Sequence, residues 1–221
     1  MHLIALVGFK GSGKDTAGRF LVDNYGFQSF SFAESLKDSL SSIFCWERSL
    51  IEGDTAESRE WRETIDPWWA KKLMIPHFTP RWAMQNIGTD VFRKHFNTDI
   101  WTLNIERKLS LLPTDSKVVL CDGRFPNEIA LGRKFGGKVV RVKRGPEPDW
   151  WNTAMEANGI IDLTIPNRSL YQVRSAARHA METNHMTHES EWAWIGTPID
   201  HTIENEKSIS HLHQEVMRVC L

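Results

Sequence analysis

Short runs of apolar residues alternate along the chain with segments in which apolar positions recur at helical spacing. The runs His2–Val7, Lys117–Cys121 and Lys138–Val142 are almost continuously apolar, which is typical of parallel strands buried on both faces. Phe27–Phe32 and His201–Glu204 have a weaker strand pattern. We therefore expect five strands, separated by helical segments.

Helical patterns occupy most of the remaining chain. Thr79 and Pro80 are typical of a helix start, because threonine caps the first turn and proline fits its first position. The predicted helices cover residues 14–24, 33–44, 80 onward, about 100–112, 126–135, 169–183 and 208–219. Strands that alternate with helices predict an α/β fold, a parallel sheet with helices on both faces. We expect a single domain over residues 1–221, in which about 45–112 is helical and about 145–191 is a lid or an insertion.

Composition removes several classes of function. The chain has 27 Lys and Arg against 28 Asp and Glu, so it has no net positive charge that would attract a nucleic acid polymer. No apolar run is long enough to cross a membrane, and the apolar start is too short for a signal peptide. The three cysteines, Cys45, Cys121 and Cys220, are far apart, which favours a reducing, cytoplasmic compartment. The histidines are irregularly spaced, which disfavours a zinc site.

The sequence GFKGSGK at residues 8–14 fits the phosphate-loop pattern GxxxxGK, between a predicted buried strand and a predicted helix. Its glycines let successive backbone N–H groups point into a concavity, where the start of a helix adds positive potential. The side chain of the final lysine can then reach the β- and γ-phosphates of a nucleotide. A glycine turn without a ligand is the alternative. The loop residues predicted to bind ATP are Lys10, Gly11, Ser12, Gly13 and Lys14.

The residue after the lysine is Asp15, where phosphate loops usually have Ser or Thr, and Thr16 follows it. The carboxylate of Asp15 can hold Mg²⁺ directly or through water, because this ion prefers hard oxygen ligands. Alternatively, Asp15 caps the helix and Thr16 contacts a phosphate. The sequence leaves both assignments open.

The helix that begins at Pro80 predicts a polar stripe at a period of 3.6 residues, formed by Arg81, Gln85, Gly88 and Phe92. A glycine inside a helix costs about 1 kcal/mol relative to alanine, so we expect it to make room for something that approaches the backbone. A solvated polar face with an incidental glycine is the alternative.

Asp122 and Arg124 follow directly after a predicted buried strand, and Glu128 lies at the start of the next helix. Ligands of open α/β sheets bind at the carboxyl ends of strands. There an aspartate can orient the water of a magnesium ion, and an arginine can donate two hydrogen bonds to a phosphate. Trp101 lies on an apolar helical stripe with Ile105, so it is first a core residue, and stacking on a base is the alternative.

Taken together, these residues resemble the bacteriophage deoxynucleoside monophosphate kinases. The resemblance rests on the GFKGSGKDT loop, the block from Arg81 through Gln85 to Asp90, Trp101, Asp122-x-Arg124 with Glu128, the segment His188–Glu191, and Ile203-x-Asn205 with Ser208. It implies a P-loop NTPase fold of the nucleoside monophosphate kinase type, with helical acceptor and lid insertions. It also implies transfer of phosphate from ATP to a deoxynucleoside monophosphate in the cytoplasm, that of the host for a phage protein. A homodimer is left open.

The resemblance also implies roles for individual residues. Gly11 to Thr16 would hold ATP and magnesium, with Asp15 and Thr16 at the metal, and catalysis would depend on Lys14, Arg124 and Asp122. The monophosphate site would be lined by Arg81, Gln85, Gly88, Thr89, Trp101, Asp122, Arg124 and Glu128. Some relatives have a basic residue in place of Trp82 or an acidic one in place of Gln85, so the accepted base is left open.

Two alternatives to this interpretation remain. One is a kinase of another small phosphate, such as phosphomevalonate, whose kinases have a similar loop. The other is a nucleotide-binding ATPase that is not a kinase. No general base stands out, which favours a phosphate acceptor, since a phosphate monoester is already largely ionised at neutral pH. Arg174 and Arg178 are four residues apart on a predicted helix, so they form either a lid over phosphates or a solvated charged face.

Overall fold

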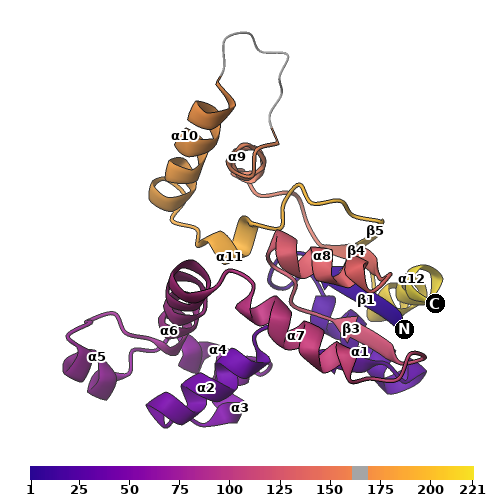
Figure 1. Cartoon of the computed structure of the whole chain (residues 1–221), viewed down its shortest axis with the longest axis horizontal. Coiled ribbons are helices and arrows are strands. Elements are labelled where there is room, and N and C mark those ends of the chain that lie inside the picture. The colour runs from indigo at the N-terminus through magenta and orange to yellow at the C-terminus, as the bar shows by residue number, and fades with distance from the viewer. Residues whose placement is uncertain (161–168) are drawn as a thin grey trace. The chain divides into compact units, whose positions relative to one another are not determined.

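A computed structural model describes residues 1–160 and 169–221 of the chain (Figure 1). The chain divides into two compact units. Unit 1 consists of Met1–Phe30 and Lys108–Leu221, and unit 2 consists of Ser31–Arg107. Most of the helical region predicted at about 45–112 therefore belongs to unit 2, whereas the phosphate loop and the strands of the described residues belong to unit 1.

Unit 1 is built on a parallel sheet with the strand order β2-β3-β1-β4-β5 in the described part of the chain. The strands are β1 His2–Val7, β2 Gln28–Phe30, β3 Lys117–Leu120, β4 Lys138–Lys143 and β5 His201–Glu204. The first strand is central, and Ile4 pairs with Val119 of β3 on one side and with Lys138 of β4 on the other. All five strands confirm the sequence prediction, and β2 is shorter than predicted.

Helices cover both faces of this sheet because successive residues of β1 point to opposite sides. Ile4 and Leu6 belong to a buried cluster with α1 (Lys14–Tyr25) and α12 (Ile209–Cys220). On the other face, α8 (Pro126–Lys134) packs so closely that a side-chain carbon at Gly132 would lie 3.1 Å from the Cβ of Ala5. Figure 1 shows α8 and α12 beside the strands of unit 1. This arrangement is an α/β fold, a parallel sheet with helices on both faces, as predicted.

The remainder of unit 1 contains α9 (Trp151–Ala157), α10 (Leu170–Thr183) and α11 (Glu189–Trp192). The predicted helix at 169–183 is confirmed by α10. The guanidinium Nε atoms of Arg174 and Arg178 both donate to the carbonyl oxygen of Ala157 and so join α10 to α9. A lid function of this region stays a prediction.

Unit 2 is helical, and aromatic side chains form much of its core. Phe44 is packed between Trp46, Trp69 and Phe78, with ring centroids 4.6–5.3 Å apart. Such rings bury a large apolar area, which accounts for many of the tryptophans in this part of the chain. The helices are α2 Glu34–Phe44, α3 Arg48–Glu52, α4 Ala56–Glu63, α5 Pro67–Leu73, α6 Pro80–Gln85 and η1 Asn86–Phe96, and α7 Ile100–Ser110 begins in this unit.

The helix that begins at Pro80 changes its hydrogen-bonding pattern after one and a half turns. Thr79 caps it as predicted, since its hydroxyl oxygen accepts from the N–H of Trp82. From Asn86 to Phe96, however, the backbone is a π-helix, a wide form that is rare in proteins and frequent at functional sites. The predicted stripe with a period of 3.6 residues is therefore wrong beyond Gln85, because η1 has more residues in each turn.

Asp200 ties the start of β5 to β4. Its Oδ2 accepts the backbone N–H of Val139 at 2.7 Å, and its Oδ1 accepts from Nη1 of Arg133 at 3.1 Å. The Val139 bond and the charge of Arg133 lower the pKa of Asp200. Because the folded state holds the ionised form, this carboxylate stabilises the protein above its unfolded pKa of 3.8, and the stabilisation is lost as the pH falls through the folded value.

We therefore expect Asp200→Ala to lower the melting temperature at neutral pH by about 2–4 °C, since a lost hydrogen bond costs about 1 kcal/mol. The difference from the wild type should be smaller at about pH 3, which lies below the unfolded pKa of 3.8, because part of the stabilising effect of the charge is already lost there. Thermal melts of both proteins at the two pH values measure this. Equal differences at both pH values would show that the charge of Asp200 is irrelevant.

Candidate active site

The phosphate loop begins where the central strand β1 ends. At Gly8, φ is +139°, and a side-chain carbon there would lie 2.3 Å from the carbonyl oxygen of Val142 in β4. Only glycine fits this approach of two backbones. The loop ends at Gly13, which has a φ of +104° and is the N-cap of α1. The glycines of GxxxxGK thus have the structural roles that the motif predicts.

Asn205, which directly follows β5, holds the loop in place, a role that the sequence pattern alone did not predict. Its Nδ2 donates to the carbonyl oxygen of Ser12 at 2.9 Å, and its own N–H donates to the carbonyl oxygen of Lys143 at 2.7 Å. A side-chain carbon at Gly13 would lie 2.5 Å from the same Nδ2. The sequence did contain one indication of this role, because Asn205 comes directly after a predicted strand and therefore lies at the carboxyl edge of the sheet.

The amino group of Lys14 donates to the carbonyl oxygen of Phe9 at 2.8 Å, within the loop. Burial lowers the pKa of Lys14; Asp15, Glu191 and Asp122 act to raise it, whereas Arg124 lowers it further. These charged groups come from α1, from α11 and from the segment after β3. The structure therefore gathers three of the predicted catalytic and metal residues around Lys14.

Asp15 and Thr16 lie in the first turn of α1, and both are exposed. Gly13 is the N-cap of this helix, and the roles of Asp15 and Thr16 stay predictions. A carboxylate and a hydroxyl beside the loop, with Asp122 acting on the same lysine, are the hard oxygen donors that fit a magnesium ion. Among the described residues, no group of three or more His, Cys, Asp or Glu side chains is arranged so that it could hold a metal ion by itself.

Glu128 fixes the backbone of the segment between β3 and α8. Its Oε2 accepts the N–H of Arg124 at 2.7 Å and that of Phe125 at 3.1 Å, and its side chain is buried. This carboxylate therefore holds the main chain of Arg124 in place. Its contact with the acceptor, which the resemblance implied, stays a prediction.

The guanidinium group of Arg124 is held by α11. Its Nη1 donates to Oε1 of Glu191 at 2.5 Å. Burial disfavours its charge, yet Glu191, Asp122 and Glu128 together raise the pKa of Arg124. Sequence reasoning placed Glu191 in a family segment but assigned it no function. The two residues are 67 positions apart, so only the fold brings them together.

An aromatic cluster surrounds the first variable residue of the phosphate loop. The ring of Phe9 contacts Trp150, Trp151 and Trp194 at centroid distances of 5.6, 6.0 and 5.2 Å. The guanidinium of Arg141 lies 4.6 Å from the ring of Trp151, a cation–π contact. This packing immobilises the residue whose carbonyl oxygen accepts from Lys14.

The predicted acceptor residues of unit 2 lie on α6, η1 and α7. Trp101 is 8% exposed, and its Nε1 donates to the carbonyl oxygen of Gly88 at 2.9 Å. The core alternative is thus confirmed for Trp101. A side-chain carbon at Gly88 would lie 2.5 Å from Cδ2 of Leu36. The room that this glycine makes is taken by Leu36 of α2 in the same unit, and a role of Gly88 in the acceptor site stays a prediction.

The other three predicted residues of this unit differ in their surroundings. Arg81 forms an ion pair with Glu63 at 2.5 Å, Gln85 is half-buried at the end of α6, and Thr89 is buried within η1. The structure thus places the predicted acceptor residues in two groups, one in each unit. Their role in binding stays a prediction.

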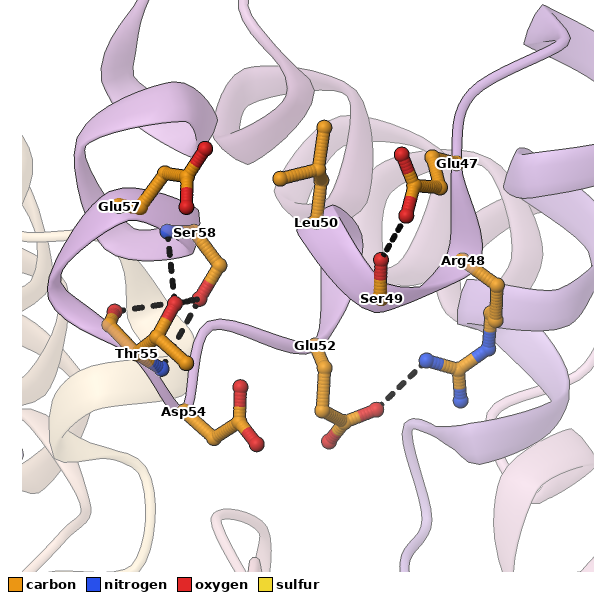
Figure 2. A pocket seen from close by; sticks show the side chains of 9 residues that line it. All are labelled: Glu47, Arg48, Ser49, Leu50, Glu52, Asp54, Thr55, Glu57 and Ser58. Atoms are coloured by element: carbon orange, nitrogen blue, oxygen red, sulfur yellow. Dashed lines mark hydrogen bonds and ion pairs between the residues drawn. The ribbon is translucent and has the colours of Figure 1, made fainter.

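Unit 2 also has an open pocket of about 490 Å³ that no predicted site residue lines. Figure 2 shows the ion pair between Arg48 and Glu52 on its wall. Although burial acts against ionisation, Lys37 and Arg48 lower the pKa of Glu52, so the wall remains anionic. An acidic pocket repels phosphate, and it is no candidate for a nucleotide. Its lining is Glu47, Arg48, Ser49, Leu50, Glu52, Asp54, Thr55, Glu57 and Ser58.

In the described part of the chain, no helix is long and apolar enough to cross a membrane. Comparison with solved structures gives a dephospho-CoA kinase from Campylobacter jejuni, 16% identical, with a TM-score of 0.40 over 99% of this chain and 95% of that one. A shikimate kinase from Acinetobacter baumannii in complex with shikimate is also 16% identical, with a TM-score of 0.39 over 99% and 92%. These likenesses are too distant to support a conclusion.

Sequence comparison is more informative. The model of the deoxynucleotide monophosphate kinase family matches residues 2–64, which include the phosphate loop. A protein of Acanthamoeba polyphaga mimivirus named "Putative deoxynucleotide monophosphate kinase" is 33% identical over 154 residues, which are 65% of this chain and 75% of that protein. That relative is viral, and the bacteriophage origin of this chain stays a prediction. The chain therefore belongs to the deoxynucleotide monophosphate kinase family and is a nucleotide kinase.

Proposed function

We propose that the protein transfers the γ-phosphoryl group of ATP to a deoxynucleoside monophosphate, with ADP and a deoxynucleoside diphosphate as products. The observation that carries this proposal is the gathering of Lys14, Arg124, Asp122 and Asp15 in unit 1. Two cations that can each bind a phosphate lie here next to carboxylates that suit a metal ion. Membership of the family favours a deoxynucleotide as the acceptor.

Positioning and charge neutralisation would supply most of the rate, because phosphoryl transfer needs little covalent chemistry from the protein. The backbone N–H groups of Lys10 to Gly13 would surround the phosphates of ATP. Lys14 would exchange the carbonyl oxygen of Phe9 for a γ-phosphate oxygen. Arg124 would bind the phosphate of the acceptor with two hydrogen bonds. That phosphate, with a second pKa of about 6, attacks as the dianion without a general base.

Magnesium fits the donor set of this site. Asp15, Thr16 and Asp122 supply two carboxylates and a hydroxyl, and Mg²⁺ is bound in such enzymes through one or two carboxylates together with the substrate phosphates. When bound, the ion neutralises charge on the β- and γ-phosphate oxygens. The residues of this chain that we assign to it are Asp15 and Thr16, with Asp122 acting through water.

Selection of the acceptor is assigned to the polar residues of unit 2. We propose that Arg81, Gln85 and Thr89 contribute to the monophosphate site, and that Gly88 and Trp101 maintain the π-helix that carries Thr89. The bond from Trp101 to the carbonyl oxygen of Gly88 supports this division. Discrimination against ribonucleotides would then come from the absence of a partner for the 2′-hydroxyl, whose unpaired burial costs about 1–3 kcal/mol.

The first test is a coupled assay with ATP against each common nucleoside monophosphate in its ribo and deoxy forms. We expect deoxynucleotides to be preferred by about five- to a hundredfold in kcat/KM, which corresponds to that free-energy cost. Equal use of both series would favour a general nucleotide kinase. Activity with phosphomevalonate in place of nucleotides, or ATP hydrolysis without transfer, would contradict the proposal.

Lys14→Ala should abolish measurable transfer, a loss of about a hundredfold or more, because a charge directed at the phosphates disappears. The melting temperature should change by less than about 3 °C, since the substitution removes a single hydrogen bond, from the amino group to the carbonyl oxygen of Phe9. Initial rates and thermal melts of the same preparations measure both. A collapse of the melting transition along with activity would point to a structural role for Lys14.

Arg124→Ala should raise the KM for the acceptor, lower kcat, or both, and leave the KM for ATP nearly unchanged. Charge-assisted contacts to phosphate are worth about 1.5–3 kcal/mol, so a loss of tenfold or more is expected. Steady-state kinetics with one substrate varied at a time separates the two values. An acceptor KM and kcat both within twofold of the wild type would remove Arg124 from the site.

A further inference from the structure

Glu191 of α11 acts on both phosphate-binding cations of unit 1. Its Oε1 accepts from Nη1 of Arg124 at 2.5 Å, and its charge also acts to raise the pKa of Lys14. Arg124 has the opposite effect on that lysine, because two nearby cations repel each other. The same carboxylate thus favours the charged forms of both side chains.

The ion pair fixes the tip of a side chain whose backbone is already fixed. Glu128 accepts the N–H of Arg124 at 2.7 Å, and Glu191 holds the other end of the residue. A long arginine side chain ordinarily loses rotamer freedom when it binds a phosphate, and this loss weakens binding. An arginine that is held at both ends has already lost that freedom.

The bond to Glu191 leaves most of the guanidinium group available. Within the described residues, the group donates its side-chain hydrogen bonds from Nη1, to Oε1 of Glu191 and, at 3.5 Å, to the carbonyl oxygen of Ser190. Nε and Nη2 accordingly keep their N–H groups for another acceptor. These two nitrogens form one edge of the planar group, which matches two oxygens of a phosphate.

Glu191 itself stands on a firmly held segment. The neighbouring Trp192 is buried, and its Nε1 donates to the carbonyl oxygen of Thr187 at 3.2 Å. At the start of α11, Nδ1 of His188 accepts the N–H of Ser190 at 3.2 Å. The carboxylate is therefore carried by a backbone that gives Arg124 a defined position.

We propose that Glu191 is a positioning residue for phosphoryl transfer, which holds Nη1 of Arg124 so that Nε and Nη2 face the acceptor phosphate. This inference rests on the proposed function of Arg124. The competing interpretation is a latch, in which Glu191 blocks Arg124 until the acceptor phosphate displaces it. The two interpretations predict opposite changes when the charge of Glu191 is removed.

The chain offers a matched control on the same helix. Glu189 pairs with Arg178 at 3.2 Å, and the exposed fractions of these two side chains are 26% and 40%. The corresponding fractions for Glu191 and Arg124 are 25% and 40%. Glu189→Gln and Glu191→Gln thus remove equally exposed ion pairs, of which only the second holds the arginine that we assign to the acceptor phosphate.

For Glu191→Gln, we expect kcat/KM for the deoxynucleoside monophosphate to fall about tenfold or more, with kcat itself reduced, because a misplaced binding group costs rate. The KM for ATP should stay within twofold, and Glu189→Gln should stay within twofold throughout. In an Arg124→Ala background, Glu191→Gln should cause no further loss. A lower acceptor KM with unchanged kcat would establish the latch instead. Equal effects of the two glutamine variants, or a full loss in the Arg124→Ala background, would also overturn the proposal.

A spectroscopic measurement tests the anchoring without any substrate. In ¹⁵N spectra of the wild type, the Arg124 side-chain signals are assigned by their loss in Arg124→Ala, and we expect separate Nη signals because the ion pair slows rotation of the group. Glu191→Gln should average them, and Glu189→Gln should leave them unchanged. Identical Arg124 signals in the wild type and in Glu191→Gln would disprove the anchoring.

The kinetic and spectroscopic measurements distinguish a failure of the proposed function from a failure of the proposed role of Glu191. A wild type that phosphorylates no deoxynucleoside monophosphate would refute the proposed function, and the spectra would still decide whether Glu191 holds Arg124. If Glu191→Gln does not fold, Glu191→Asp replaces it. That variant keeps the charge but shortens the side chain, so its Arg124 signals should be displaced and its kcat reduced, and wild-type values in both would overturn the proposal.

Discussion

Gly8 brings the backbone of the phosphate loop so close to Val142 that a single added carbon would lie 2.3 Å from that carbonyl oxygen. The loop can lie here only because β1 is central in the sheet and β4 runs parallel beside it. The turn into α1 and the hydrogen bond from Asn205 to Ser12 both depend on this contact. The position of Lys14, whose amino group bonds to the loop itself, follows as well.

The charges around the loop form a balanced set rather than a simple cationic site. Lys14 and Arg124 repel each other, and Glu191 and Asp122 offset that repulsion in the folded chain. Partial burial makes each of these interactions stronger than it would be in water. The protein thus leaves neither of these two cations, which we propose to bind phosphates, without a compensating charge. It does so with carboxylates from α11 and from the end of β3.

The parts of the fold that local chemistry decides were predictable from the sequence. A buried strand is recognisable as an apolar run, and the loop from Gly8 to Lys14 as a motif, because neighbouring residues determine both. The π-helix η1 was not predictable in this way. Trp101 bonds to the carbonyl oxygen of Gly88 and Leu36 packs on that residue, and such contacts change the winding without changing the apolar pattern.

The site residues that were predicted are determined by their neighbours in the sequence, whereas those that were missed depend on distant contacts. Lys14 ends the loop that follows β1, and Asp122 and Arg124 follow β3, so their edge of the sheet could be inferred from their neighbours. Asn205 holds Ser12 across 193 residues of sequence, and Glu191 holds Arg124 across 67. Nothing in the local pattern of an asparagine or a glutamate reveals a partner at that distance. The strand order and the placement of α11 determine which residues these two side chains contact.

The aromatic cluster around Phe9 has a consequence beyond packing. Three indole rings contact this one residue of the phosphate loop, and Arg141 stacks on two of them. Tryptophan emission depends on the charges and dipoles near the ring, so a change in the loop reaches these fluorophores directly. The packing that keeps the loop in place thereby also gives the protein an intrinsic optical signal of the state of its nucleotide site.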